Sequence, residues 1–333
     1  MLKRIMVPLD GSERAERGLA MAARLARATG SELLLVRVVS IPPIRFVPYG
    51  EPAQIALALI ANARQAADEY LKRIEKSPLV EGITVEARAI EGHVTGDLLE
   101  VARIEHCDLI VLTTHGYSGF NHLRLGRVAQ HVARHSVVPV LVLPVRDDSP
   151  AHPGSTGEVR MLVTLDGSSL AEAAVAPALE LGRAMAAPER ISVHLLQVVD
   201  FFTAMMSDAE RGQNAPPPEI GAEERALEQA RLYLTEYTER IRRENPPMKV
   251  TSSAVLAGDA AKMICDIAGT PPAYDFVAMA THGRGGLQRW AMGSTTERVL
   301  HAIHLPLLIV RSPVAIEHDL AASEAAELEE LHR

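Results

Sequence analysis

Two kinds of loop in this chain carry residues suited to holding a phosphorylated ligand. Asp10 and Asp166 each follow a short apolar run and open an Asp-Gly-Ser turn, in PLDGS and TLDGS. Further along, Gly116 and Gly283 are each separated by nine residues from a second glycine that opens a helix-like segment. Glycine lets a backbone approach a ligand closely, and the bare N–H groups of a helix N-terminus attract phosphate. These loops predict a phosphate site with a carboxylate nearby.

The two aspartates have two interpretations. A carboxylate at the end of a strand can accept hydrogen bonds from the amino or hydroxyl groups of a ligand. An Asp at such a place also serves as a turn or helix-cap residue, and either copy alone leaves this alternative open. The repetition of Asp10 as Asp166 favours a ligand contact.

The chain contains an internal repeat, which indicates that one fold occurs twice. The segment IMVPLDGSERAERGLAMAARLA returns as MLVTLDGSSLAEAAVAPALELG, and LIVLTTHG returns as FVAMATHG. Asp166 follows Asp10 by 156 residues, whereas the later glycines repeat after 167. The extra residues of the second copy fall in FFTAMMSDAERGQNAPPPEIG, and DDSPAHPGSTG between the copies has the composition of an exposed linker. We predict a first domain over 1–147, a linker over 148–157, a second domain over 158–313 and an acidic tail over 314–333.

Composition narrows the class of protein. The 333 residues suffice for two domains, and 47% hydrophobic with 4% aromatic residues predicts cores of Ala, Val, Leu and Ile. A net charge of −8 argues against a nucleic-acid surface. No apolar run approaches the roughly 20 residues of a membrane span, so we expect a cytoplasmic protein with no membrane contact. Cys107 and Cys265 lack CxxC spacing and are expected to be reduced thiols.

Strand-like and helix-like segments alternate in the first copy. We predict strands over 2–9, 32–39, 83–90, 108–114 and 139–145, and helices from the first turn to Gly30 and over 55–76, 97–106 and 127–135. Such alternation implies a parallel sheet covered on both faces. The predicted fold class is α/β, with two tandem doubly wound five-stranded domains. For the strand order 3-2-1-4-5, ligands bind between the first and fourth strands, where the two best-repeated loops fall.

These residues together resemble the universal stress protein family, over essentially the whole chain except the linker and tail. That family's nucleotide pattern is Gly, two residues, Gly, nine residues, then Gly-Ser or Gly-Thr, paired with an Asp after the first strand. In the second copy Gly283, Gly293 and Ser294 fit this pattern, and Ala280 replaces the first Gly. The second copy therefore keeps most of the motif.

The first copy departs further from the pattern. Gly116 and Gly126 fit, but Thr113 stands at the first Gly and Arg127 at the final hydroxyl residue. A cation in the first helical turn is disfavoured by the helix dipole unless an anion lies nearby. Arg127 either pairs with phosphate or occludes the pocket, and the residues leave both interpretations open. We expect the second domain to bind its ligand more tightly.

The resemblance implies a flavodoxin-like, adenine nucleotide alpha hydrolase-like fold and ATP as the ligand, with or without Mg²⁺. It places the two aspartates at the adenine end, the backbone of Val38 and Val198 against the base, and the hydroxyls of Ser294 and Thr295 on the phosphates. The full set of implied binding residues is Pro8, Asp10, Val38, Thr113, Gly116, Gly126, Arg127, Asp166, Val198, Ala280, Gly283, Gly293, Ser294 and Thr295.

The resemblance further implies an ATP-binding regulator in the stress response. We find no nucleophile, metal cluster or positioned base beside the expected phosphates, which argues against a fast phosphoryl-transfer enzyme. His131 and His135 in HVARH lack the Glu of HExxH and are interpreted as solvated helix residues. Slow ATP hydrolysis and an adaptor role with one or both sites degenerate remain alternatives. In the family the last strands pair domains, so we expect the two copies to pair, and association into a homodimer stays open, as does any protein partner.

Overall fold

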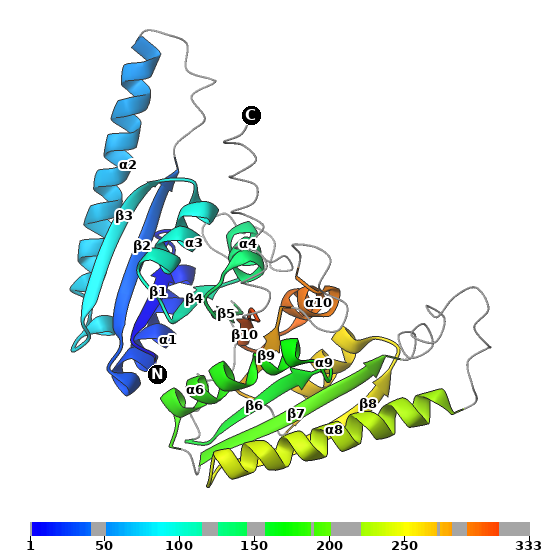
Figure 1. Cartoon of the computed structure of the whole chain (residues 1–333). Helices are drawn as coiled ribbons and strands as arrows, with labels where there is room; N and C mark the ends of the chain where they lie inside the picture. The colour runs from blue at the N-terminus through cyan, green and yellow to red at the C-terminus, as the bar shows by residue number, and fades with distance from the viewer. Residues whose placement is uncertain are drawn as a thin grey trace, which may run out of the picture. The chain divides into compact units, whose positions relative to one another are not determined.

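The structure, a computed structural model (Figure 1), describes residues 2–40, 51–114, 126–144, 157–187, 190–200, 221–271, 274–281 and 292–312. The chain divides into two compact units, Met1–Ser149 and Pro150–Arg333. Each holds one copy of the repeat, and we refer to them as unit 1 and unit 2.

Unit 1 alternates strands and helices along the chain as predicted. Helix α2 begins before the predicted residue 55, because Pro52 fits the first turn of a helix, where its missing N–H would have no helical partner. The elements are β1 (Arg4–Pro8), α1 (Glu13–Thr29), β2 (Glu32–Ser40), α2 (Glu51–Glu75), the short 3-10 helix η2 (Pro78–Val80), β3 (Val85–Gly92), α3 (Val94–Ile104), β4 (Leu109–Thr113), α4 (Arg127–His135) and β5 (Val140–Leu143).

Unit 2 follows the same order, with its first helix in two pieces. The elements are β6 (Val159–Leu165), α5 (Ser169–Glu172), α6 (Val175–Met185), β7 (Ile191–Asp200), α8 (Ala222–Glu244), β8 (Lys249–Ala257), α9 (Ala260–Gly269), β9 (Phe276–Ala280), α10 (Ser294–Ala302) and β10 (Leu307–Val310).

The break between α5 and α6 has a cause in the sequence. Helix α5 ends at its C-cap Ala173, and α6 begins at Val175. A proline inside a helix lacks its own N–H, and its ring collides with the carbonyl four residues earlier, which for Pro177 is that of Ala173. The matching residue of unit 1 is Met21, which α1 buries without interruption. The architecture expected twice therefore differs at this helix.

Each unit contains a five-stranded parallel sheet. The strand order is β3-β2-β1-β4-β5 in unit 1 and β8-β7-β6-β9-β10 in unit 2. Neighbouring strands pair in parallel throughout each unit. This confirms the predicted doubly wound α/β fold with the order 3-2-1-4-5. The order reverses between β1 and β4 and between β6 and β9, where a ligand crevice is expected in such sheets.

Helices cover both faces of each sheet. In unit 1, α1 packs on β4 and α2 on β3, while α3 and α4 pack against each other on the opposite face, as right-handed crossovers require (Figure 1). The inner strands are buried along almost their whole length, and β9 is buried at every residue. A continuous apolar run is what a strand covered on both faces needs. The core is mainly aliphatic, as the composition predicted, and Phe276 and Met6 are the exceptions among its largest fully buried side chains.

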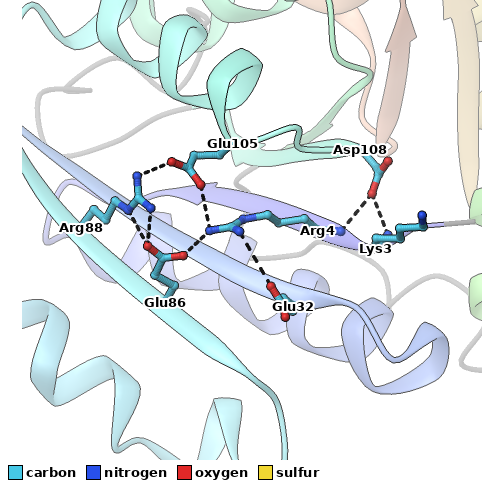
Figure 2. Close-up of polar contacts among 7 residues, drawn as sticks. All are labelled: Lys3, Arg4, Glu32, Glu86, Arg88, Glu105 and Asp108. Atoms are coloured by element: carbon cyan, nitrogen blue, oxygen red, sulfur yellow. Dashed lines mark hydrogen bonds and ion pairs between the residues drawn. The ribbon is translucent and has the colours of Figure 1, made fainter.

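An ion-pair network lies at the amino end of the unit 1 sheet (Figure 2). Arg4, the first residue of β1, pairs with Glu86 on β3 and, at 3.2 Å between Nη2 and Oε2, with Glu105 after α3. Arg88 pairs with both of these carboxylates. The network links β1, β3 and α3 at the end of the sheet opposite to the expected crevice.

The amino end of unit 2 carries different side chains. The His194 ring lies 2.9 Å through Nδ1 from Thr251 Oγ1 and 2.8 Å through Nε2 from Ser253 Oγ. Strand register puts Thr251 and Ser253 where unit 1 has Glu86 and Arg88. The side chains on β3 and β8 therefore differ between the copies, whereas the loops at the carboxyl ends are repeated.

Candidate functional site

Strand pairing brings the two repeated loops of each unit to one edge of its sheet. Strand β1 pairs with β4, with Met6 opposite Ile110, and β6 pairs with β9, with Leu162 opposite Val277. Parallel neighbours end at the same edge, so the turn after β1 lies beside the end of β4, and the turn after β6 beside the end of β9. This is the juxtaposition that the sequence predicted.

The Asp-Gly-Ser turns have the same geometry in both units. Asp10 Oδ1 accepts hydrogen bonds from the backbone N–H of Ser12 at 3.0 Å and from its hydroxyl at 2.6 Å. Asp166 Oδ1 accepts the same two bonds from Ser168, at 2.9 and 2.6 Å. The glycine between them has a positive φ of 89° at Gly11, which an L side chain rarely adopts. The turn thus holds each carboxylate in a set direction at the end of its strand.

The helix-cap interpretation applies to the serines and not to the aspartates. Ser12 is the N-cap of α1 and accepts the Ala15 N–H, and Ser168 caps α5 through the Ala171 N–H, both at 3.2 Å. The Asp10 side chain is exposed and that of Asp166 is half-buried. Each aspartate is therefore a turn residue whose carboxylate also reaches the surface at the carboxyl edge.

The strand residues expected near a base lie beside these turns. Pro8 ends β1 and is opposite Val36, two residues before Val38 in β2. Val38 and Val198 are both half-buried, and Val198 occupies the matching place in β7. Their backbones are one strand away from the aspartate turns.

Helices α4 and α10 begin next to the strand ends. The Gly126 N–H donates to the Thr114 carbonyl at 2.6 Å, and the Gly293 N–H donates to the Thr281 carbonyl at 2.7 Å. These two glycines are the N-caps, and neither helix start has a side-chain cap. A Cβ on Gly293 would lie 3.2 Å from the Thr281 carbonyl oxygen, so the backbones approach too closely for a comfortable side chain. Each helix therefore begins at the carboxyl edge of its sheet with a glycine N-cap, which offers no side-chain acceptor to the first N–H groups.

The first helical turns differ between the units. Arg127 at the start of α4 is exposed, as is Ser294 at the start of α10, and Thr295 is half-buried. The Thr296 hydroxyl is buried and donates to the Ala280 carbonyl at 2.9 Å, which ties α10 to the end of β9. Ala129 occupies this position in α4 and has no hydroxyl. Thr113 and Ala280 end β4 and β9, so the motif residues that the structure describes lie along one edge of each unit.

A pair of side chains that the sequence reasoning missed reaches the same edge. The Tyr70 hydroxyl on α2 donates to Glu16 Oε1 on α1 at 3.1 Å, and Tyr233 on α8 donates to Glu172 Oε1 on α5 at 3.0 Å. Burial and the neighbouring glutamate raise the pKa of both tyrosines above the ordinary value. The repeat contained a sign of these glutamates, because both copies have Asp-Gly-Ser followed, after two residues, by Ala-Glu.

A sequence model of the universal stress protein family matches residues 1–144 and again residues 159–311. The chain belongs to this family. Universal stress protein Rv2005c of Mycobacterium tuberculosis is 24% identical over 324 residues, covering 92% of this chain and 96% of that protein. Universal stress protein MJ0531 of Methanocaldococcus jannaschii is 31% identical over 144 residues, covering 43% of this chain and 82% of that protein.

Solved structures agree on the fold. The crystal structure of a universal stress protein from Archaeoglobus fulgidus superimposes with a TM-score of 0.66 at 18% identity, covering 92% of this chain and 98% of that one. This match, which covers most of both chains, shows that the solved protein has the same fold.

The described part of this universal stress protein offers few other groups for catalysis or metal binding. His131 and His135 stack on α4 with ring centroids 4.2 Å apart, and burial together with the neighbouring charges lowers the pKa of His131. Among the described residues no group of three or more His, Cys, Asp or Glu is arranged to hold a metal ion. Cys107 and Cys265 are unpaired thiols, and burial raises the pKa of Cys107 to about 11.

Gly116 and Gly283 lie outside the described residues, so the middle of each glycine loop stays a prediction. Among the helices that the structure describes, none is long and apolar enough to cross a membrane.

Proposed function

We propose that this universal stress protein is an ATP-binding regulator of the stress response in the cytoplasm. ATP, with or without Mg²⁺, occupies the carboxyl-edge crevice and biases the conformation or the choice of partner. The observation that carries the proposal is the duplicated edge itself. In both units a turn-held aspartate follows one strand, and a helix with a glycine N-cap begins beside the adjacent strand.

The described residues fit an adenine nucleotide. Bare N–H groups and the positive end of a helix dipole favour phosphate, and α10 adds exposed Ser294 and half-buried Thr295 there. Its N-cap, Gly293, lies so close to the Thr281 carbonyl that a Cβ there would be only 3.2 Å from the carbonyl oxygen. At the other end of the crevice, a carboxylate is suited to amino and hydroxyl donors of adenosine.

The binding residues implied by the family resemblance divide by role under this proposal. Asp10 and Asp166 accept from the adenosine end, and the backbones at Val38 and Val198 contact the base. The remaining residues, which form the phosphate loops and the strand ends beneath them, are Pro8, Thr113, Gly116, Gly126, Arg127, Ala280, Gly283, Gly293, Ser294 and Thr295.

Unit 2 is proposed as the tighter site. Its helix α10 begins with hydroxyl side chains that donate to phosphate without adding bulk, whereas α4 begins with Arg127 and Val128. We further propose that the two copies pair through their last strands and that the domains are bounded at 1–147 and 158–313.

Calorimetric titration of the full chain with ATP and Mg²⁺ tests the proposal, with Gly293→Ala and Gly126→Ala as a matched pair. The added Cβ displaces phosphate or the Thr281 carbonyl, so Gly293→Ala should weaken the tighter site about tenfold, equivalent to about 1.4 kcal/mol. Gly126→Ala should leave that site intact. Thermal unfolding of both variants checks that each remains folded.

Two outcomes contradict the proposal. Loss of the tighter site in Gly126→Ala alone would assign it to unit 1. An absence of heat at millimolar ATP in the wild-type chain would overturn nucleotide binding and favour an adaptor role.

A further inference from the structure

The strand residue before Val38 and Val198 differs between the units. Register aligns Arg37 in β2 with Gln197 in β7, because Pro8 is opposite Val36 and the matching Thr164 is opposite Leu196. Both positions lie beside the aspartate turn of their unit. The difference therefore changes the charge at the predicted adenosine end of one crevice.

Arg37 is held in place by two neighbours. A Cβ built on Gly11 would lie 3.1 Å from Nη2 and 3.2 Å from Cζ and Nη1, so the guanidinium packs against the glycine that follows Asp10. Its Cζ also lies 4.9 Å from the centroid of the Tyr70 ring, a cation–π distance. The Tyr70 hydroxyl is itself fixed by Glu16. The guanidinium is thus positioned between the turn and the ring.

The hydrogen-bond donors of this guanidinium are not used by the described residues. Arg37 makes no hydrogen bond or ion pair within the part of the chain that the structure describes. By contrast, Arg4 and Arg88 pair with carboxylates at the amino end, and Arg240 pairs with Glu172 at 3.0 Å. A half-buried, positioned guanidinium with its fork of N–H groups available is suited to bidentate binding of phosphate.

Unit 2 offers no equivalent charge at this position. Gln197 is 5% exposed, and its Oε1 accepts no hydrogen bond from the described residues. Arg240 on α8 lies over the Tyr237 ring at 4.2 Å and is engaged by Glu172. A neutral amide cannot compensate a phosphate charge, and its carbonyl oxygen repels one.

We propose that Arg37 forms an anion subsite at the adenosine end of unit 1, so that unit 1 selects a nucleotide phosphorylated on its ribose as well as at its 5′ position. Arg127 at the start of α4 supplies a second cation at the 5′-phosphate end. Gln197 and Ser294 give unit 2 the preference for an ordinary adenine nucleotide. This inference rests on the proposed nucleotide site and assigns different ligands to the two units.

Calorimetric titration of the full chain with AMP, adenosine 3′,5′-bisphosphate and adenosine 2′,5′-bisphosphate tests it. The wild-type chain should bind one of the bisphosphates more tightly than AMP, at one molecule per chain, and comparison of the two isomers identifies the ribose position. Arg37→Gln, which gives unit 1 the unit 2 residue, should reduce this preference about tenfold, the loss expected for one charge-assisted contact. Arg37→Lys, which keeps the charge without the fork, should retain part of it.

Arg73→Gln is the matched control. Arg73 also lies over the Tyr70 ring, at 5.3 Å, but it is exposed on α2. Its substitution removes the same charge from the same ring and should leave the preference unchanged. Thermal unfolding of each variant checks the fold.

Three results would overturn the inference. A preference unchanged in Arg37→Gln, or reduced equally in Arg73→Gln, removes the role of Arg37. Wild-type protein that binds ATP but shows no preference for either bisphosphate over AMP refutes the subsite and leaves the proposed function intact. Wild-type protein that binds no adenine nucleotide refutes both.

Discussion

The Tyr70 hydroxyl donates to Glu16 across 54 residues of sequence, and Tyr233 donates to Glu172 across 61, with nearly the same geometry in the two units. Each bond joins the second long helix of its unit to the first turn of the helix that follows the aspartate. The pairs therefore connect the position of α2 and α8 to the turns at the candidate site.

Removing these hydroxyls should destabilise the chain. Tyr70→Phe and Tyr233→Phe each remove one donor to a glutamate, and a hydrogen bond to a partly exposed charged group contributes about 1–2 kcal/mol. We expect a fall of that size in the free energy of unfolding, measured by urea denaturation. Tyr274→Phe serves as the control, because that hydroxyl makes no hydrogen bond to the described residues, and it should change little. A loss as large in Tyr274→Phe would attribute the effect to packing.

The same tyrosines predict a dependence of stability on alkaline pH. Their pKa values are raised in the folded state, so their contribution is complete below the unfolded tyrosine pKa of about 10 and is lost as pH rises above it. The unfolded chain then loses protons that the folded chain keeps, with up to about 1.4 kcal/mol per pH unit from each group. Unfolding free energies measured between about pH 9 and pH 11, on either side of the unfolded tyrosine pKa, should fall more steeply for wild type than for Tyr70→Phe/Tyr233→Phe. Parallel curves would contradict the assignment.

The serine caps should matter equally in the two units. Ser12→Ala and Ser168→Ala each remove an N-cap acceptor and a donor to an aspartate, and loss of such a cap costs about 1 kcal/mol. Urea denaturation should show this loss for both variants. Calorimetry should show weaker ATP binding for Ser168→Ala, since the Asp166 carboxylate loses the hydroxyl donor and keeps the backbone N–H of residue 168. The adjacent exposed Ser169 provides the control, and Ser169→Ala should leave both quantities near wild type. Unchanged stability in both cap variants would show that the turns hold without the serines.

Much of the candidate site could be predicted from sequence because its residues occur in short local motifs. An apolar run followed by Asp-Gly-Ser specifies a strand, a turn that needs a positive φ and a capped helix, and each of these depends on neighbours within a few residues. The position of Gly293 followed in the same way from its spacing, and the structure adds the reason, a carbonyl 3.2 Å from where a Cβ would stand. Pro177 by itself also indicates the helix break, but the similarity of the two copies led to the prediction of the same helix in both.

The contacts that distinguish the units depend on residues distant in sequence. In the run Ser-Thr-Thr the sequence does not distinguish Thr296 from the two residues before it, yet its hydroxyl is buried and donates to the Ala280 carbonyl. The sequence around Arg37 does not indicate that its side chain packs on Gly11 and Tyr70. It also does not indicate that Gln197 occupies the matching position in unit 2.

The sequence by itself determined the duplication, the order of strands and helices, and the placing of the aspartates and glycine motifs at strand ends, because periodicity and turn chemistry act over short stretches. The tertiary structure decided which side chains meet at those ends. Strand order and helix packing bring Glu16, Arg37 and Tyr70 around one turn, and the distances between them depend on the packed sheet and not on their separation along the chain.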